Sequence, residues 1–252
     1  MPRAERTIRV EAIILQHSDW GEADRLLRLF TREHGKLRAI VKGARKMQSR
    51  KAGHLEPFMR SSLMLAKGHD LWIVTQAEVI DPYSSLRENL ELTARAAYVI
   101  ELLDRLTYEE GQNWQLFDLV AKTLTRLVEQ ADPFVPIHYY EMRILDLTGY
   151  RPLLFECASC RKEIKAEDQF FAAEVGGVLC PNCGARAEGS RMISMDTLRF
   201  LRHFQRSTYN ESLKASPAAK TRAEVESILN YYLTYLLERG LNSTEFLKQI
   251  QN

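Results

Sequence analysis

The sequence predicts an α+β protein in which an N-terminal β-barrel is followed by an α-helical domain with an inserted cysteine-rich lobe. Three observations carry this prediction. Apolar residues alternate with a period of two over the first eighty or so positions, the period changes to about 3.6 after Asp81-Pro82, and all four cysteines lie in one short stretch. We expect a barrel over residues 1–80, a helical domain over 81–152 and 191–252, and a lobe over 153–190.

Five short strands are expected in the barrel. In the first, over residues 7–16, Ile8, Val10, Ala12 and Ile14 share one face. A short glycine-containing turn at residues 33–35 joins strands at 24–31 and 36–41, and a second hairpin joins 61–66 to 71–77. This number of strands in this length is typical of an OB-type barrel, with a small sandwich as the alternative.

The helices are expected from apolar stripes and capping residues. Ser85 and Glu88 form a possible capping box for one long helix over 85–108, with a stripe at Leu86, Leu90, Ala97, Ile100, Leu103 and Leu106. Next comes a helix after Asn113, whose buried face would be Trp114, Phe117, Val120, Leu124 and Leu127. A third runs from Asp132-Pro133 to Gly149. We expect further helices over 196–206 and 222–239, a short last helix capped by Ser243, and a mobile surface loop over 210–220.

The cysteines form two C-x-x-C pairs separated by nineteen residues: Cys157, Cys160, Cys180 and Cys183. This spacing is typical of a zinc site in which two tight turns meet across a hairpin. Two disulfides, a thioredoxin-type redox pair and four unrelated thiols are the alternatives. A redox motif would use a single C-x-x-C at the start of a helix, so two matched pairs favour zinc.

The expected zinc ion is structural, with one Zn²⁺ per chain. Catalytic zinc keeps three protein ligands and an open position for water, whereas here four thiolates would fill all positions. No histidine lies near either pair in the sequence. Such an ion would stabilise a small lobe without defining its function.

The basic charge is concentrated at the front of the chain. Residues 1–80 carry 15 Lys and Arg against 9 Asp and Glu, a net charge of +6, while residues 81–252 carry 20 against 24, a net −4. The segment 42–51 alone contains five basic residues and no acidic residue. A positive, glycine-containing segment of this kind predicts contact with nucleic-acid phosphates, and a solvated loop that only aids solubility is the alternative.

The candidate DNA contacts lie in and beside this segment: Lys36, Arg38, Lys42, Arg45, Lys46, Arg50 and Lys51. Trp20 is a candidate for stacking on a base, because it and His17 are expected in one of the two loops that OB folds use for this purpose, and His69 in the other. Packing at the rim of the barrel is the alternative for any one of these rings.

The sequence excludes several classes of protein. It has no apolar run long enough to span a membrane, no signal peptide, and no P-loop, H-E-x-x-H or G-x-S-x-G motif. We therefore expect a cytoplasmic protein without membrane partners and without enzymatic activity. Free thiols suit a reducing compartment.

Three stretches near the front of the chain are distinctive: residues 11–15 (EAIIL), 21–37 (GEADRLLRLFTREHGKL) and 41–46 (VKGARK). In these stretches, and in the order of barrel, helices and zinc lobe over nearly the whole chain, the sequence resembles the bacterial recombination mediator RecO. The resemblance implies a nucleoid-associated protein of DNA repair that binds single- and double-stranded DNA, anneals complementary strands, and works with RecR. It also implies contact with the C-terminal tail of single-stranded-DNA-binding protein and help in loading RecA at gaps.

The resemblance carries over the four cysteines as ligands and Lys42, Arg45, Lys46, Arg50 and Lys51 as DNA contacts; Lys36 and Arg38 lie on a strand rather than in the loop. An alternative from another class is a zinc-stabilised adaptor whose basic loop docks acidic protein partners.

Overall fold

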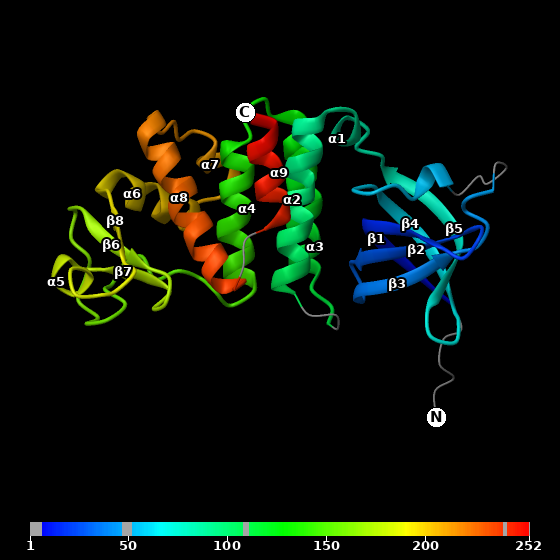
Figure 1. Cartoon of the computed structure of the whole chain (residues 1–252), viewed down its shortest axis with the longest axis horizontal. Helices are drawn as coiled ribbons and strands as arrows, with labels where there is room; N and C mark the ends of the chain where they lie inside the picture. The colour runs from blue at the N-terminus through cyan, green and yellow to red at the C-terminus, as the bar shows by residue number, and fades with distance from the viewer. Residues whose placement is uncertain (1–6, 47–51, 108–110, 239–240, 252) are drawn as a thin grey trace. The chain divides into compact units, whose positions relative to one another are not determined.

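The computed structural model describes residues 7–46, 52–107, 111–238 and 241–251. Contacts between residues divide the chain into two compact units, one made of Met1–Glu129 with Gln249–Asn252 and the other of Gln130–Lys248. The first contains a β-barrel and helices α1 to α3, and the second contains further helices and a small sheet (Figure 1). The division into barrel, helical domain and cysteine-rich lobe that the sequence predicts remains a prediction.

The first unit begins with a closed five-stranded barrel of strand order β1-β2-β3-β5-β4. Closure confirms the barrel predicted from the sequence. Neighbouring strands are antiparallel except β3 and β5, which pair in parallel at only two positions. The strands are β1 (Thr7–Trp20), β2 (Asp24–Thr31), β3 (Gly35–Val41), β4 (Arg60–Lys67) and β5 (Trp72–Asp81).

The barrel interior is filled by the alternating apolar residues of each strand. Val10, Ala12 and Ile14 of β1 are buried in it and Ile8 packs against it, so the predicted face is confirmed. Successive side chains point to opposite faces of a strand, which is why this simple alternation places them together. The other strands contribute buried residues such as Leu27, Leu29, Ala39, Val41, Leu63, Leu65 and Val74.

Strand β1 is longer than predicted. The sequence placed its end at Gln16, but pairing with β2 continues to the pair Trp20 and Asp24, after a register shift between Ile14 and Gln16. The turn is therefore short, with Gly21 at φ +57°. His17 and Trp20 lie on the strand rather than in a loop, so their predicted placement was wrong.

The single helix expected over residues 85–108 is divided in two, α1 (Ser85–Glu88) and α2 (Leu90–Leu106). Asn89 is extended between them, and its side chain accepts a hydrogen bond from the Leu92 N–H, as a strong N-cap residue does. The capping box predicted at Ser85 and Glu88 does not form. The residue at the N-cap position of α1 is Ser84, and its side chain makes no capping hydrogen bond. Leu90 consequently begins a new helix and is 58% exposed rather than buried.

Helices α3 (Trp114–Glu129) and α4 (Phe134–Leu147) confirm the next two predictions. The Asn113 side chain accepts a hydrogen bond from the Leu116 N–H at 3.0 Å, and the Asp132 side chain accepts one from the Phe134 N–H at 3.0 Å. A side chain therefore satisfies a free backbone N–H at the start of each helix. The predicted face of α3 is buried except for Trp114, which is 54% exposed in the first turn.

The second unit contains α4, a three-stranded sheet of order β7-β6-β8 and further helices (Figure 1). Part of the loop predicted over 210–220 is helical, since Thr208 and Glu211 form a capping box at the start of α7. The predicted end of the following helix at Arg239 and Gly240 lies outside the described residues. The remaining elements are β6 (Gln169–Ala172), β7 (Gly177–Leu179), α5 (Pro181–Gly184), β8 (Arg191–Ile193), α6 (Met195–Arg206), α7 (Tyr209–Ser212), α8 (Ala219–Leu236) and α9 (Asn242–Gln251).

No helix in the described part of the chain combines the length and the apolar character that crossing a membrane requires.

Asp104 of α2 is the point where basic barrel side chains meet a helix. Arg28 of β2 donates to both carboxylate oxygens at 2.7 Å, and the Lys36 ammonium lies 3.0 Å from one of them. Lys36 also donates to the backbone oxygens of Asp104 and Thr107. Burial raises the pKa of Asp104, but the hydrogen bonds and charges of Lys36 and Arg28 outweigh it and hold that pKa below its ordinary value.

We expect Asp104→Ala to lower the free energy of unfolding by roughly 1–3 kcal/mol at neutral pH, because two partly buried cations lose their partner. The depressed pKa means that the stabilisation is present above the unfolded-state value of about 3.9 and is lost as the pH falls through the lower folded-state value. Denaturant unfolding at pH 7 and pH 3 measures both. Asp70→Ala, at a side chain 84% exposed, is the matched control and should change little. Equal effects of the two substitutions would contradict the assignment.

Candidate functional site

The first C-x-x-C pair lies in a tight turn before the small sheet. The Cys157 N–H donates to the Lys162 oxygen at 2.8 Å, and the Arg161 N–H donates to the Cys157 oxygen at 2.9 Å. Arg161 has a positive φ of 62°, so the chain reverses sharply immediately after Cys160. This turn directs both sulfur atoms to the same side.

The second pair lies at the end of β7. Cys180 precedes the short helix α5, whose first residue is proline, and its backbone oxygen accepts from the Cys183 N–H at 3.0 Å and from the Gly184 N–H at 2.8 Å. Gly184 is required here, because a Cβ atom at this position would overlap the Phe170 ring of β6. The β6–β7 hairpin therefore fixes where the second turn begins.

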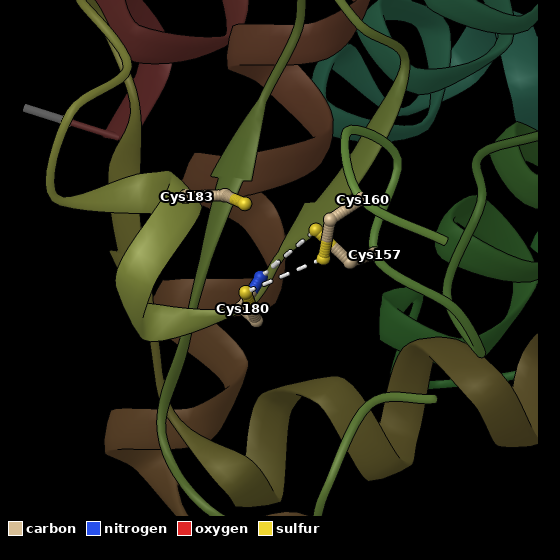
Figure 2. A group of neighbouring side chains, drawn as sticks. All are labelled: Cys157, Cys160, Cys180 and Cys183. Carbon is tan, nitrogen blue, oxygen red and sulfur yellow. Dashed lines mark hydrogen bonds between the residues drawn. The ribbon is translucent and has the colours of Figure 1, made fainter. Parts of the chain in front are cut away.

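Backbone contacts join the two turns. The Ala158 N–H donates to the Val178 oxygen of β7 at 2.8 Å, and the Cys180 N–H donates to the Cys157 sulfur at 3.4 Å. Figure 2 shows the four cysteine side chains gathered around a common point, with this N–H bond and the contact between Cys160 and Cys180 as dashed lines.

The geometry of the cluster fits a single tetrahedral metal ion. All four sulfur atoms lie within 4.8 Å of one another, and those of Cys160 and Cys180 are 3.9 Å apart. A zinc–sulfur bond of about 2.3 Å places the corners of a tetrahedron roughly 3.8 Å apart. The thiols are free, and this separation is far beyond a disulfide bond of about 2.05 Å. The cluster can therefore hold a metal ion, and it contradicts both the two-disulfide interpretation and that of four unrelated thiols.

The cysteines differ in acidity. Burial opposes ionisation of the Cys157 thiol, but the backbone N–H groups of Cys160, Cys180 and Ser159 outweigh it and lower its pKa to about 6. The hydrogen bond with Cys180, assisted by burial, raises the pKa of Cys183 to about 12. One thiolate is thus favoured at neutral pH, and a bound cation would compensate the charge of the others.

The predicted basic segment begins as a turn directly after β3. Asp24, the first residue of β2, accepts from the Gly43 N–H at 2.8 Å with one carboxylate oxygen and from the Lys42 ammonium at 2.8 Å with the other. The Arg45 N–H donates to the Ala23 oxygen at 2.9 Å. The hydrogen bonds from Lys42 and Gly43 lower the pKa of Asp24. The basic turn, which we define as residues 42–46, is therefore built on the β1–β2 turn.

The structure brings Lys42, Arg45, Lys46 and Trp20 to one end of the barrel. All three basic residues are exposed, and Trp20, 47% exposed, pairs with Asp24 across the β1–β2 ladder. Arg45 lies 3.3 Å from Asp19, which precedes Trp20. Arg50 and Lys51 lie outside the described residues.

Lys36 and Arg38 lie elsewhere on β3. The Lys36 side chain is only 10% exposed and donates to α2, so its ammonium is already occupied. Arg38 is exposed and lies opposite Arg28 in the β2–β3 ladder. Of the histidines expected beside Trp20, His17 lies 3.4 Å from Glu56, while His69 is 96% exposed between β4 and β5.

Sequence reasoning missed Asp24 as the residue that positions the basic turn. Its partner Lys42 lies 18 positions later, and no short motif connects them. The only signal was an acidic residue at the first position of the predicted second strand, where its side chain could meet the end of the third.

Comparison with known proteins places both parts of the chain in one family. The family model "Recombination protein O N terminal" matches residues 5–83, and "Recombination protein O C terminal" matches residues 87–245. A DNA repair protein RecO from Roseiflexus sp. (strain RS-1) is 41% identical over 98% of this chain and 87% of its own length.

Two further relatives agree. A DNA repair protein RecO of Pelotomaculum thermopropionicum is 36% identical over 95% of this chain and 93% of its own length. One from Dehalococcoides mccartyi (strain CBDB1) is 32% identical over 92% of this chain and 91% of its own length. With a closed barrel, a helical body and a four-cysteine cluster in the expected order, this chain belongs to the RecO family of DNA repair proteins.

Proposed function

We propose that this chain is a non-enzymatic recombination mediator that binds single- and double-stranded DNA and anneals complementary strands. The observation that carries the proposal is the basic turn, where Lys42, Arg45 and Lys46 are exposed beside Trp20 on a barrel end. Family membership supplies the context of DNA repair. With RecR as partner, the protein would help load RecA at gaps, in contact with the tail of single-stranded-DNA-binding protein, in the bacterial cytoplasm at the nucleoid.

The basic turn suits phosphate binding because its backbone is fixed while its cations are exposed. Asp24 holds the Gly43 N–H, so the turn does not need to be ordered on binding. Lys and Arg side chains displace counterions from the nucleic-acid backbone without reading bases. We include Arg38, Arg50 and Lys51 as further contacts and Trp20 as a surface for base stacking, and omit Lys36 because its ammonium is bound to α2.

We further propose that the ion of the cysteine cluster is Zn²⁺ with a structural role. Four sulfur ligands favour zinc over the harder divalent cations, and they leave no position for substrate. The residues that would hold it are Cys157, Cys160, Cys180 and Cys183. Bound zinc would stabilise the two turns and the sheet that joins them.

A second candidate is an adaptor that docks acidic protein partners on the basic turn. It is favoured by one observation, since Lys42 and Arg45 already lie within 2.8 and 3.3 Å of the carboxylates of Asp24 and Asp19. Competition separates the two functions. Under the DNA proposal, an oligonucleotide binds more tightly than polyglutamate of equal charge, and the reverse order would favour the adaptor.

The first prediction from the proposed function concerns the metal. Purified protein should contain one zinc per chain, and Cys180→Ser should lower its thermal stability because three ligands hold the ion poorly and metal binding contributes to folding. Metal analysis and thermal unfolding with and without a chelator measure this, with exposed Ser216→Ala as the control. Metal-free protein whose unfolding is unchanged by the chelator would remove the proposal.

The second prediction concerns salt. If about four phosphates are neutralised, the logarithm of affinity for a single strand should fall with the logarithm of salt at a slope of about −3. Arg45→Glu with Lys46→Glu should flatten that slope, as measured by fluorescence anisotropy at several salt concentrations. An unchanged slope in a folded double variant would move the DNA site away from the basic turn.

The third prediction is that annealing needs no nucleotide cofactor. Positive charge on the barrel screens the repulsion between two strands, and base pairing itself provides the driving force. Fluorophore-labelled complementary oligonucleotides in magnesium buffer, with and without ATP, test this directly. Annealing that depends on ATP, or that is not accelerated despite measurable DNA binding, would overturn the proposed activity.

A further inference from the structure

Three arginines form a cationic row on α6, in the second unit of the chain. Arg199, Arg202 and Arg206 follow one another at spacings of three and four residues, so they share one face of the helix. The opposite face is buried in the unit through residues such as Leu198, Leu201 and Phe204. Arg199 and Arg206 are seven positions apart, which gives the row a length of about 10 Å.

The last two arginines are held in place by an aromatic ring. The guanidinium carbon of Arg206 lies 3.6 Å from the centre of the Phe155 ring, and that of Arg202 lies 4.9 Å from it. Arg202 also donates to the Leu154 oxygen at 2.9 Å. These contacts reduce the rotamer freedom of both side chains before any ligand arrives, which lowers the entropic cost of binding.

The positive charge of this pair is not neutralised locally. Among the described residues, no carboxylate oxygen lies within 4.0 Å of Arg202 or Arg206, although Glu163 attracts Arg202 from farther away. Burial and then the charge of Arg206 lower the pKa of Arg202, as expected for two cations held close together. Arg199 is 71% exposed and only 3.8 Å from Asp196.

The cysteine cluster positions the ring beneath these arginines. Phe155 lies two residues before Cys157, and its backbone oxygen accepts from the Ile164 N–H at 3.1 Å, across the first cysteine turn. A bridge between Glu156 and Glu163 closes the same ribbon. The turn that carries two of the metal ligands therefore also fixes Phe155.

We propose that Arg199, Arg202 and Arg206 form a second phosphate-binding surface, which takes the backbone of a single-stranded nucleic acid. A guanidinium donates two parallel hydrogen bonds to a phosphate, and the row presents three guanidinium groups in succession along about 10 Å. The arginines cover the Phe155 ring, so binding would be independent of sequence. An acidic peptide is less well matched, because the guanidinium groups of Arg202 and Arg206 cover the Phe155 ring and leave no apolar contact there for the peptide's apolar side chains.

This inference rests on the proposed function, since it takes nucleic acid as the ligand, and it gives the chain a second site in addition to the basic turn. A chain with two such sites holds two strands at once. That would raise the local concentration of one strand near another, which is what annealing requires.

The test uses the full-length protein and two non-complementary oligothymidylates, one with a donor fluorophore and one with an acceptor. Wild-type protein should bring them together and give energy transfer. Arg202→Glu with Arg206→Glu should abolish the transfer while the binding of one oligonucleotide by the basic turn remains. The loss of two phosphate contacts should also reduce the salt slope of the second binding step by about 1.4.

A matched control is Lys122→Glu with Lys220→Glu, which changes the charge equally at two exposed positions outside the row. It should retain the energy transfer. Arg206→Gln alone alters one exposed side chain and should weaken the transfer partially, which provides a test if the double variant fails to fold.

The outcomes separate the two proposals. If both the double variant and Arg206→Gln give wild-type transfer, the second surface is wrong while the basic turn stands. Equal loss in the lysine control would also overturn it. If the wild-type protein binds no oligonucleotide at all, the proposed function itself fails. If the arginine variants lose binding of polyglutamate but keep both oligonucleotides, the row is a docking site for acidic protein and not for nucleic acid.

Discussion

Four sulfur atoms within 4.8 Å of one another are the constraint on which the second unit depends. Four thiolates this close repel one another, so only a bound cation allows all of them to ionise and stay together. The cluster joins the two cysteine turns, in addition to the backbone hydrogen bond from Ala158 to Val178. The cluster is connected to two helices. Phe155, beside the first cysteine turn, packs against Arg206 of α6, and Phe171 of the sheet packs against Tyr232 of α8 with ring centres 5.5 Å apart.

In the first unit, two carboxylates hold neighbouring groups in place. Asp24 fixes the basic turn through a backbone N–H and Lys42, while Asp104 occupies Arg28 and Lys36. The net charge of residues 1–80 therefore overstates the positive charge that a ligand can reach. What matters is which cations are exposed, and three of them, Lys42, Arg45 and Lys46, lie at the end of the barrel that carries Trp20.

The features that sequence reasoning predicted correctly depend on local patterns. Alternation in β1 identified Val10, Ala12 and Ile14 as core. The paired C-x-x-C spacing identified four cysteines that cluster closely enough to hold a metal ion. Sequence reasoning failed where a competing local signal, or a residue distant in the sequence, determines the structure. Asn89 capped a new helix and divided the one expected over 85–108, and pairing with β2 extended β1 to Trp20. Asp104 meets Arg28 across 76 positions, a contact that no window of sequence reveals.

The most direct test of this account is X-ray absorption spectroscopy at the zinc edge of the purified protein. The cluster geometry predicts four sulfur ligands at about 2.3 Å and no lighter atom bound to the metal. Because the two turns, the ring of Phe155 and the row on α6 all depend on that arrangement, the result bears on each of them. A spectrum with nitrogen or oxygen among the ligands, or a protein that retains no metal after purification, would contradict it.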